Sequence, residues 1–128
     1  SDARTLTEAK ACKIFNLRLA KCGGFSGCLA QLTIAMRHGL DCQLGVLVGE
    51  TSILTAAEQE FLAGVGCLRH HEFGFPRLFL ADDPARGASG VFLRGVAQPR
   101  PAAPGFGIRV VPEALERATT EKITVNLV

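Results

Sequence analysis

Two kinds of apolar spacing alternate along the first 73 residues, and this alternation limits the chain to one class of fold. An apolar residue at every second position is typical of strands, whereas apolar residues three and four positions apart are typical of helices. The first spacing predicts strands at residues 14–20, 42–48 and 67–73. The second predicts helices at residues 5–12, 25–38 and 53–62. Helices and strands that alternate with short connections form parallel strands with helices packed outside them, so the sequence predicts an α/β fold.

The pattern changes in the last third of the chain. A stretch rich in Gly, Pro and Arg runs from Asp82 to Pro104, and residues 105–111 and a short predicted helix at 112–118 follow it. No further strand–glycine–helix unit can be recognised there. We therefore expect residues 81–128 to wrap around or cap the α/β part.

Composition and charge exclude several kinds of partner. Fourteen basic residues against twelve acidic ones give a net charge of +2, far from the concentrated basic excess that a nucleic acid partner requires. No apolar run approaches the roughly 20 residues that span a bilayer, and the first residues lack the features of a secretory signal. Five cysteines without a C-x-x-C pair predict reduced thiols. We expect a protein of the cytoplasm that binds neither nucleic acid nor a membrane.

Few residues capable of chemistry follow the predicted strands, where parallel α/β folds carry their active sites. Lys21 ends the first strand, Glu50 follows the second, and Glu72 lies in the third. Gly23 and Gly24 allow a ligand to approach the backbone closely, and a partly desolvated Lys21 could carry a proton near neutral pH. A solvated loop lysine and an ordinary glutamate at a helix start are the competing interpretations.

The pair His70-His71 does not predict a metal site. Neighbouring side chains on a strand point to opposite faces, so both imidazoles cannot bind one ion without a kink. Glu50 and Glu72 alone do not build the octahedral oxygen site that Mg²⁺ needs. We therefore expect no metal site formed by this chain alone.

Two segments of the chain resemble a known family. The string Asn16–Gly24, with the residues NLRLAKCGG, is followed by a predicted helix and then by Gln43–Thr51, with the residues QLGVLVGET. Together they resemble the muconate-lactonizing subgroup of the enolase superfamily, in which the first string is the sixth strand of a TIM-like barrel and holds one of two acid/base lysines. The seventh strand of that family ends near a glutamate. The resemblance implies that Lys21 and Glu50 are catalytic and that the substrate contacts three further residues, namely Gly23, Gly24 and Glu72.

The resemblance also implies where the parts of the molecule lie. Residues 1–80 would form the sixth to eighth strands of the barrel with their helices, which are about three βα units. Residues 81–128 would form a wrapping or capping segment, because Pro104–Ile108 resembles the closing segment of the family. The carboxylates that bind Mg²⁺ and the opposing lysine of the family would lie before Ser1. We therefore expect a chain that is inactive alone, that pairs with the N-terminal barrel half or a second chain, and that forms oligomers.

An enzyme of this kind removes the proton α to a carboxylate in an isomerase, cycloisomerase or epimerase reaction. The resemblance thus implies a small carboxylate substrate and a magnesium cofactor. The dipeptide-epimerase branch commonly has Asp-x-Asp at the eighth strand, and residues 70–75 (HHEFGF) lack it, which argues against a dipeptide. The alternative is a non-catalytic small α/β module that uses the strand ends as a binding or assembly interface.

Overall fold

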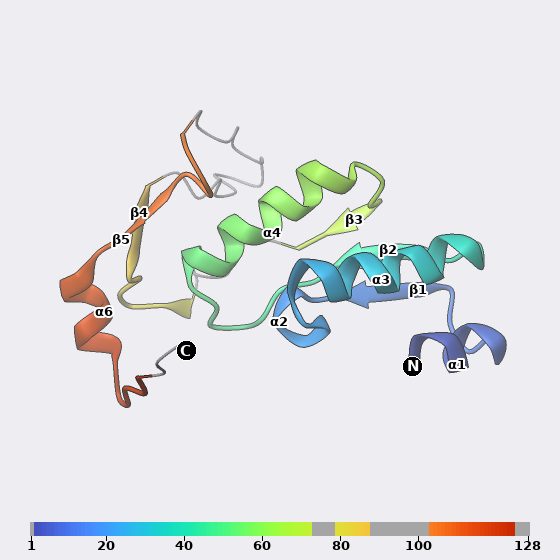
Figure 1. Ribbon diagram of the computed structural model, residues 1–128, viewed down its shortest axis with the longest axis horizontal. Coiled ribbons are helices and arrows are strands. Elements are labelled where there is room, and N and C mark those ends of the chain that lie inside the picture. The colour runs from blue at the N-terminus through green and yellow to red at the C-terminus, as the bar shows by residue number, and fades with distance from the viewer. Residues whose placement is uncertain (1, 73–78, 88–102, 125–128) are drawn as a thin grey trace.

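The computed structural model describes residues 2–72, 79–87 and 103–124. Up to residue 72, helices and strands alternate in the order α1 (Asp2–Glu8), β1 (Ile14–Leu17), α2 (Leu19–Cys22), α3 (Gly24–Arg37), β2 (Asp41–Leu44), α4 (Ser52–Val65) and β3 (His70–His71). The later described residues form β4 (Ala85–Gly87), β5 (Ile108–Val110) and α6 (Pro112–Ala118). Figure 1 shows the two groups of elements side by side.

The first group is built around a parallel sheet in the order β1-β2-β3. The register of the first pair runs from Ile14 opposite Asp41 to Leu17 opposite Leu44, and Gln43 lies opposite His70 in the second pair. Helices connect all three parallel strands, as a parallel sheet requires. The predicted α/β class is confirmed.

One face of this sheet forms the core. Along β1, Phe15 and Leu17 are buried while Ile14 and Asn16 are exposed, so the first two side chains point toward the helices and the other two toward the opposite face. The core also contains buried residues of the two long helices and of β2, namely Cys28, Leu32, Ala35, Phe61, Cys42 and Leu44. The opposite face of β1 carries no helix in the described part of the chain, and we call it the open face of the sheet.

The strand predictions are too long in three places. The predicted strand 14–20 ends at Leu17, and helix α2 replaces its last residues. Leu19 fits the apolar alternation of a strand, and it is indeed buried, with 4% of its surface exposed. Its backbone, however, belongs to helix α2. The predicted strand 42–48 is Asp41–Leu44, and the described part of the predicted strand 67–73 contains only the two-residue strand His70–His71.

The predicted glycine turn at residues 21–24 is a junction between two helices. Gly23 ends α2 and precedes α3 with a φ of 84°, a left-handed conformation that side chains with a Cβ rarely adopt. Gly27 then allows α2 to approach α3, because a Cβ at this position would lie 1.6 Å from the carbonyl oxygen of Cys22. The two glycines hold α2 directly after the end of β1.

The second group of elements packs at the N-terminus of α4. Strands β4 and β5 form an antiparallel pair, with Ala85 opposite Val110. Asp83, which precedes β4, accepts hydrogen bonds from the backbone N–H and the hydroxyl group of Ser52, the first residue of α4. Asp82 forms ion pairs with Arg86 and with Arg117 of α6. Residues 88–102 of the predicted wrapping segment lie outside the described residues.

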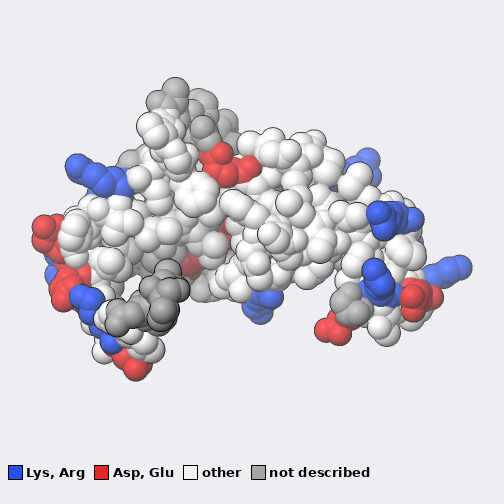
Figure 2. Space-filling view, viewed as in Figure 1, with Lys and Arg blue, Asp and Glu red and all other residues white. Residues whose placement is uncertain are grey.

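Charged residues do not gather into one basic patch on the face seen in Figure 2. Basic and acidic side chains occur together toward both ends of the molecule, and the middle of this face is mostly uncharged. Among the helices that the structure describes, none has the length and apolar character needed to cross a membrane.

Candidate functional site at the carboxyl ends of the parallel strands

The residues that follow β1, β2 and β3 form one row at the carboxyl end of the sheet. The backbone N–H of Gly45 donates to the carbonyl of Leu17 at 2.8 Å, and the N–H of Glu72 donates to the carbonyl of Leu44 at 3.0 Å. These hydrogen bonds continue the strand ladder by one residue, so Arg18, Gly45 and Glu72 lie next to one another. The arrows of β1 and β2 in Figure 1 point toward the side of the molecule that holds α2.

Glu72 is fixed on this row by two hydrogen bonds. Its Oε1 accepts from the side-chain amide of Gln43 at 2.9 Å, and its Oε2 accepts from the backbone N–H of Val46 at 3.3 Å. Gln43 belongs to β2 and lies opposite Asn16 of the open face. The structure therefore places the predicted substrate-binding residue Glu72 at the strand ends, with its carboxylate partly occupied by protein donors.

Glu50 is buried in the loop that joins β2 to α4. Only 6% of its surface is exposed. Its Oε2 accepts from the backbone N–H of Leu47 at 2.9 Å, and its Oε1 accepts from the hydroxyl group of Thr55 at 2.6 Å. Both carboxylate oxygens thus hold the loop in place, which makes Glu50 an anchor of the strand-end loop.

Glu58 is a functional-site candidate that the sequence interpretation missed. It is 1% exposed, and burial, together with the negative charge of Glu50, a hydrogen bond with Glu50 and the charge of Glu72, raises its pKa to about 9. Glu58 is therefore a neutral acid at pH 7 and can donate its proton to the Glu50 carboxylate. The signal in the sequence is its helical spacing from Leu54 and Phe61, which places a carboxyl group on the apolar side of α4.

Lys21 does not lie at a strand end. It is an exposed residue of α2, four positions after the last residue of β1. Within the described residues, no hydrogen bond or ion pair joins it to Glu50 or Glu72. Gly23 and Gly24 beside it have positive φ, and nothing lies within 4 Å of the position that a Cβ would take, so their backbone is open to an approaching group.

Arg18 occupies the position after β1 that the sequence interpretation assigned to Lys21. Its backbone is extended, with a φ of −134° and a ψ of 118°. The apolar spacing placed Arg18 inside the predicted strand 14–20 and not after its end. The early end of β1 at Leu17 is what makes it the strand-end cation.

The described residues do not fit a magnesium site of their own. No group of three or more His, Cys, Asp or Glu side chains is arranged within them to hold a metal ion. Of the three acidic residues near the strand ends, Glu50 and Glu72 use both carboxylate oxygens to accept protein hydrogen bonds, and Glu58 is a neutral acid. We therefore assign no chemical step of this chain to a bound metal.

Comparison with known proteins gives consistent matches over most of the chain. Residues 1–114 match the family model described as Enolase C-terminal domain-like. The chain is 30% identical over 125 residues to D-Ala-D/L-Ala epimerase of Cytophaga hutchinsonii, which covers 98% of this chain and 33% of that protein. The chain therefore spans about a third of the length of this relative.

Two solved structures extend the comparison to the fold. Muconate lactonizing enzyme from Pseudomonas putida superposes with a TM-score of 0.77 at 28% identity, covering 91% of this chain and 31% of that one. The dipeptide epimerase from Cytophaga hutchinsonii, solved with Mg and the dipeptide D-Ala-L-Val, superposes with a TM-score of 0.73 at 27% identity. That match covers 85% of this chain and 29% of the epimerase.

Proposed function

This chain belongs to the enolase C-terminal domain-like family, and on that premise we propose that it forms the C-terminal part of a barrel enzyme that moves the proton α to a carboxylate. The observation that carries the proposal is the row of charged residues at the carboxyl ends of three parallel strands, where Arg18 and Glu72 flank Gly45. Parallel barrels place their active sites at these strand ends. The proposed reaction is an isomerase, cycloisomerase or epimerase reaction on a small carboxylate.

The proposed catalytic residues are Lys21 and Glu50. A lysine amine can accept or return a proton near neutral pH when it is partly desolvated, and an assembled barrel would cover the surface on which Lys21 lies. Glu50 would act by holding the strand-end loop with its two hydrogen bonds. Gly23, Gly24 and Glu72 would contact the substrate, the two glycines through their open backbone.

The proposal includes Mg²⁺ as the cofactor of the assembled enzyme. One similar protein, the dipeptide epimerase of Cytophaga hutchinsonii, was solved with Mg. Because the described residues of this chain do not fit such a site, we propose that the ligands belong to the part of the enzyme outside this chain.

The proposed partner is the remaining barrel, supplied by the N-terminal half or by a second chain. In the described part of the sheet, β1 pairs with β2 alone and β3 pairs with β2 alone, so both edges can accept a further strand. Large apolar side chains are also exposed, including Ile14 of β1 at 45% and Val48 after β2 at 74%. A barrel that continues past both edges would cover such surface, and we also propose that the assembled protein is oligomeric and cytoplasmic.

The experiment is an exchange assay on an assembled barrel. This chain would be combined with the N-terminal two thirds of the Cytophaga hutchinsonii epimerase, and exchange of the α-proton in deuterated water would be followed by NMR. Candidate substrates are N-acylamino acids, muconate-type dicarboxylates and dipeptides. Exchange with any of them supports the proposal. Stable assembly without exchange on any of them would favour the non-catalytic binding module instead.

A further inference from the structure

We infer that Arg18 binds the carboxylate of the substrate at the end of β1, an inference that rests on the proposed function and names a residue that contacts the substrate. The evidence is its place in the sheet and the Nε–H of its guanidinium group, which has no acceptor in the described part of the chain. Lys21 lies within the next helix, α2, and not at the end of β1.

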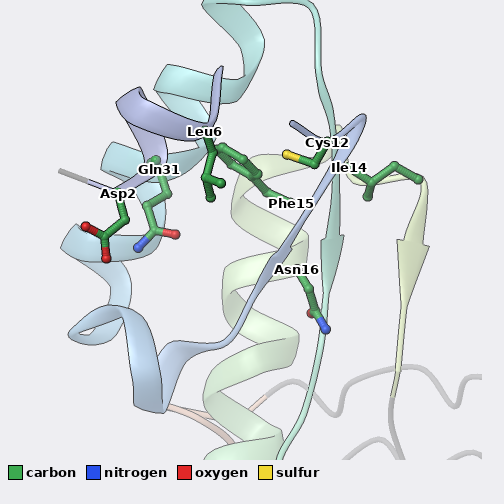
Figure 3. A pocket seen from close by; sticks show the side chains of 8 residues that line it. Asp2, Leu6, Cys12, Ile14, Phe15, Asn16 and Gln31 are labelled. Carbon is green, nitrogen blue, oxygen red and sulfur yellow. The ribbon is translucent and has the colours of Figure 1, made fainter. Parts of the chain in front are cut away.

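The strand pattern puts Arg18 on the open face. Phe15 and Leu17 point to the core, whereas Ile14 and Asn16 point to the other side of β1, as Figure 3 shows for Ile14, Phe15 and Asn16. The extended backbone of Arg18 continues this alternation by one step. Its side chain therefore belongs with those of Ile14 and Asn16, on the face of the sheet away from α3.

The guanidinium group of Arg18 lacks a protein partner in the described part of the chain. Its buried Nε–H has no acceptor there, and no ion pair among the described residues includes Arg18. Some other arginines are paired: Arg69 contacts Asp41, and Arg117 contacts Asp82. A buried donor without an acceptor costs free energy. A bound carboxylate would remove that cost, because its two oxygens match the donor fork of a guanidinium group.

The neighbour of Arg18 in the row, Gly45, has no side chain, and the Asn16 amide lies over it. A Cβ at Gly45 would lie 2.1 Å from Oδ1 of Asn16, so the absence of a side chain at Gly45 is what lets the Asn16 amide lean over β2. On the far side of Gly45, the carboxylate of Glu72 is held by Gln43 and Val46 and forms no ion pair with Arg18. The Glu72 carboxylate thus does not neutralise the guanidinium group, and the Asn16 amide is a second polar group on the same face of β1.

A guanidinium group cannot give up its proton near neutral pH, so Arg18 can bind and orient a carboxylate but cannot carry the α-proton. This separates its role from the one proposed for Lys21. Loss of Arg18 should weaken the binding of carboxylates, whereas loss of a proton carrier should lower turnover.

The direct test is an NMR titration of the 128-residue chain that follows the Nε–H signals of its arginines. The probes are sodium acetate, sodium chloride at the same ionic strength, and acetamide, which has the shape of acetate without its charge. We expect the Arg18 signal to shift saturably with acetate and with neither of the other two. The signal of Arg37, exposed at the end of α3, is the internal reference.

Two substitutions complete the test. Arg18→Gln and Arg18→Lys should each weaken acetate binding roughly tenfold or more, measured on the backbone amide signal of Gly45, because each removes the paired donor fork. Arg37→Gln should leave acetate binding unchanged. If acetate shifts the Arg18 signal no more than it shifts the Arg37 signal, or if Arg18→Gln binds acetate as tightly as the parent, the inference is wrong.

The outcome also separates this inference from the proposed function. A saturable acetate shift at Arg18 together with no α-proton exchange in the assembled barrel would retain Arg18 as a carboxylate-binding residue and reject the reaction. Exchange in the assembled barrel with an unchanged KM in Arg18→Gln would retain the reaction and reject the role of Arg18.

Discussion

Glu58 of α4 shares a hydrogen bond with Glu50, and both carboxyl groups are almost completely buried behind the ends of the parallel strands. Two buried carboxyl groups in contact cannot both be ionised at low cost, so one of them keeps its proton. Burial and the charge of Glu50 raise the pKa of Glu58 to about 9, and the two oxygens of Glu50 accept hydrogen bonds from Leu47 and Thr55. At pH 7 Glu58 therefore keeps its proton beside Glu50, the residue that holds the strand-end loop.

Glu58→Gln should make stability less dependent on pH. The folded chain holds the Glu58 proton up to a pKa of about 9, and the unfolded chain releases it near 4.5. The folded state thus binds more protons between these values, and the free energy of unfolding falls as the pH rises through this range. Glutamine keeps a donor toward Glu50 but cannot ionise, so at pH 8 the free energy of unfolding of the variant should exceed that of the parent by up to about 5 kcal/mol.

Urea unfolding at pH 5, 7 and 9 measures this difference. Glu116→Gln, on the exposed surface of α6, is the matched control and should follow the parent at every pH. Equal stability of Glu58→Gln and the parent at all three values would show that Glu58 is ionised in the folded chain at neutral pH.

Gly27→Ala should destabilise the junction between α2 and α3. The new Cβ would lie 1.6 Å from the carbonyl oxygen of Cys22, so α2 must move away from the helix. Overpacking of this kind costs about 1–3 kcal/mol, and backbone contacts relax less easily than side-chain contacts. Gly64→Ala is the matched control, because nothing lies near its Cβ position in α4, and it should stabilise the chain by about 0.5–1 kcal/mol. Thermal unfolding of both variants should show a lower midpoint for Gly27→Ala and a higher one for Gly64→Ala. A Gly27→Ala variant as stable as the parent would contradict the close approach of α2 to α3.

Asp83→Ala should release the C-terminal segment from α4. Asp83 accepts from the backbone N–H of Ser52 and so caps a helix that has no cap from its own preceding residue, Thr51. Loss of such a cap costs about 0.5–2 kcal/mol. Asp82→Ala is the matched control: it removes only exposed ion pairs with Arg86 and Arg117, so its effect should be smaller and should fade at high salt. Hydrogen exchange at the first turn of α4 measures the difference, and equal protection in both variants would contradict a capping role.

The alternating order of helices and strands could be predicted from the sequence because each element has its own apolar spacing. The end of β1 could not, since Leu19 is buried whether its backbone is extended or helical. Because of this error, the sequence interpretation placed Lys21 at the strand end, where the structure has Arg18. Glu58 was missed although its helical spacing places it on the apolar side of α4, because that spacing does not show its contact with Glu50. Asp83 was missed because its contact with Ser52 joins residues far apart in the sequence, and local spacing contains no information about such a contact.

Lys21 remains the predicted proton carrier, and its substitution should affect turnover more than binding. In the assembled barrel, Lys21→Ala should leave KM within a few fold and lower kcat by roughly 10²–10⁴, the effect of losing a general acid or base. Lys21→Arg should be nearly as damaging, because a guanidinium group keeps its proton. The stability of the chain should change little, since Lys21 is exposed on α2.

Lys10→Ala is the matched control for Lys21, because Lys10 is also an exposed lysine but lies after α1, at the opposite end of β1. Rates of α-proton exchange in deuterated water, measured for all three variants, give the comparison. Exchange at the parent rate in both Lys21 variants would assign the proton transfer to a residue outside this position. Because Arg18 cannot replace an amine as the proton carrier, that result would place the acid/base group on the part of the barrel that this chain joins.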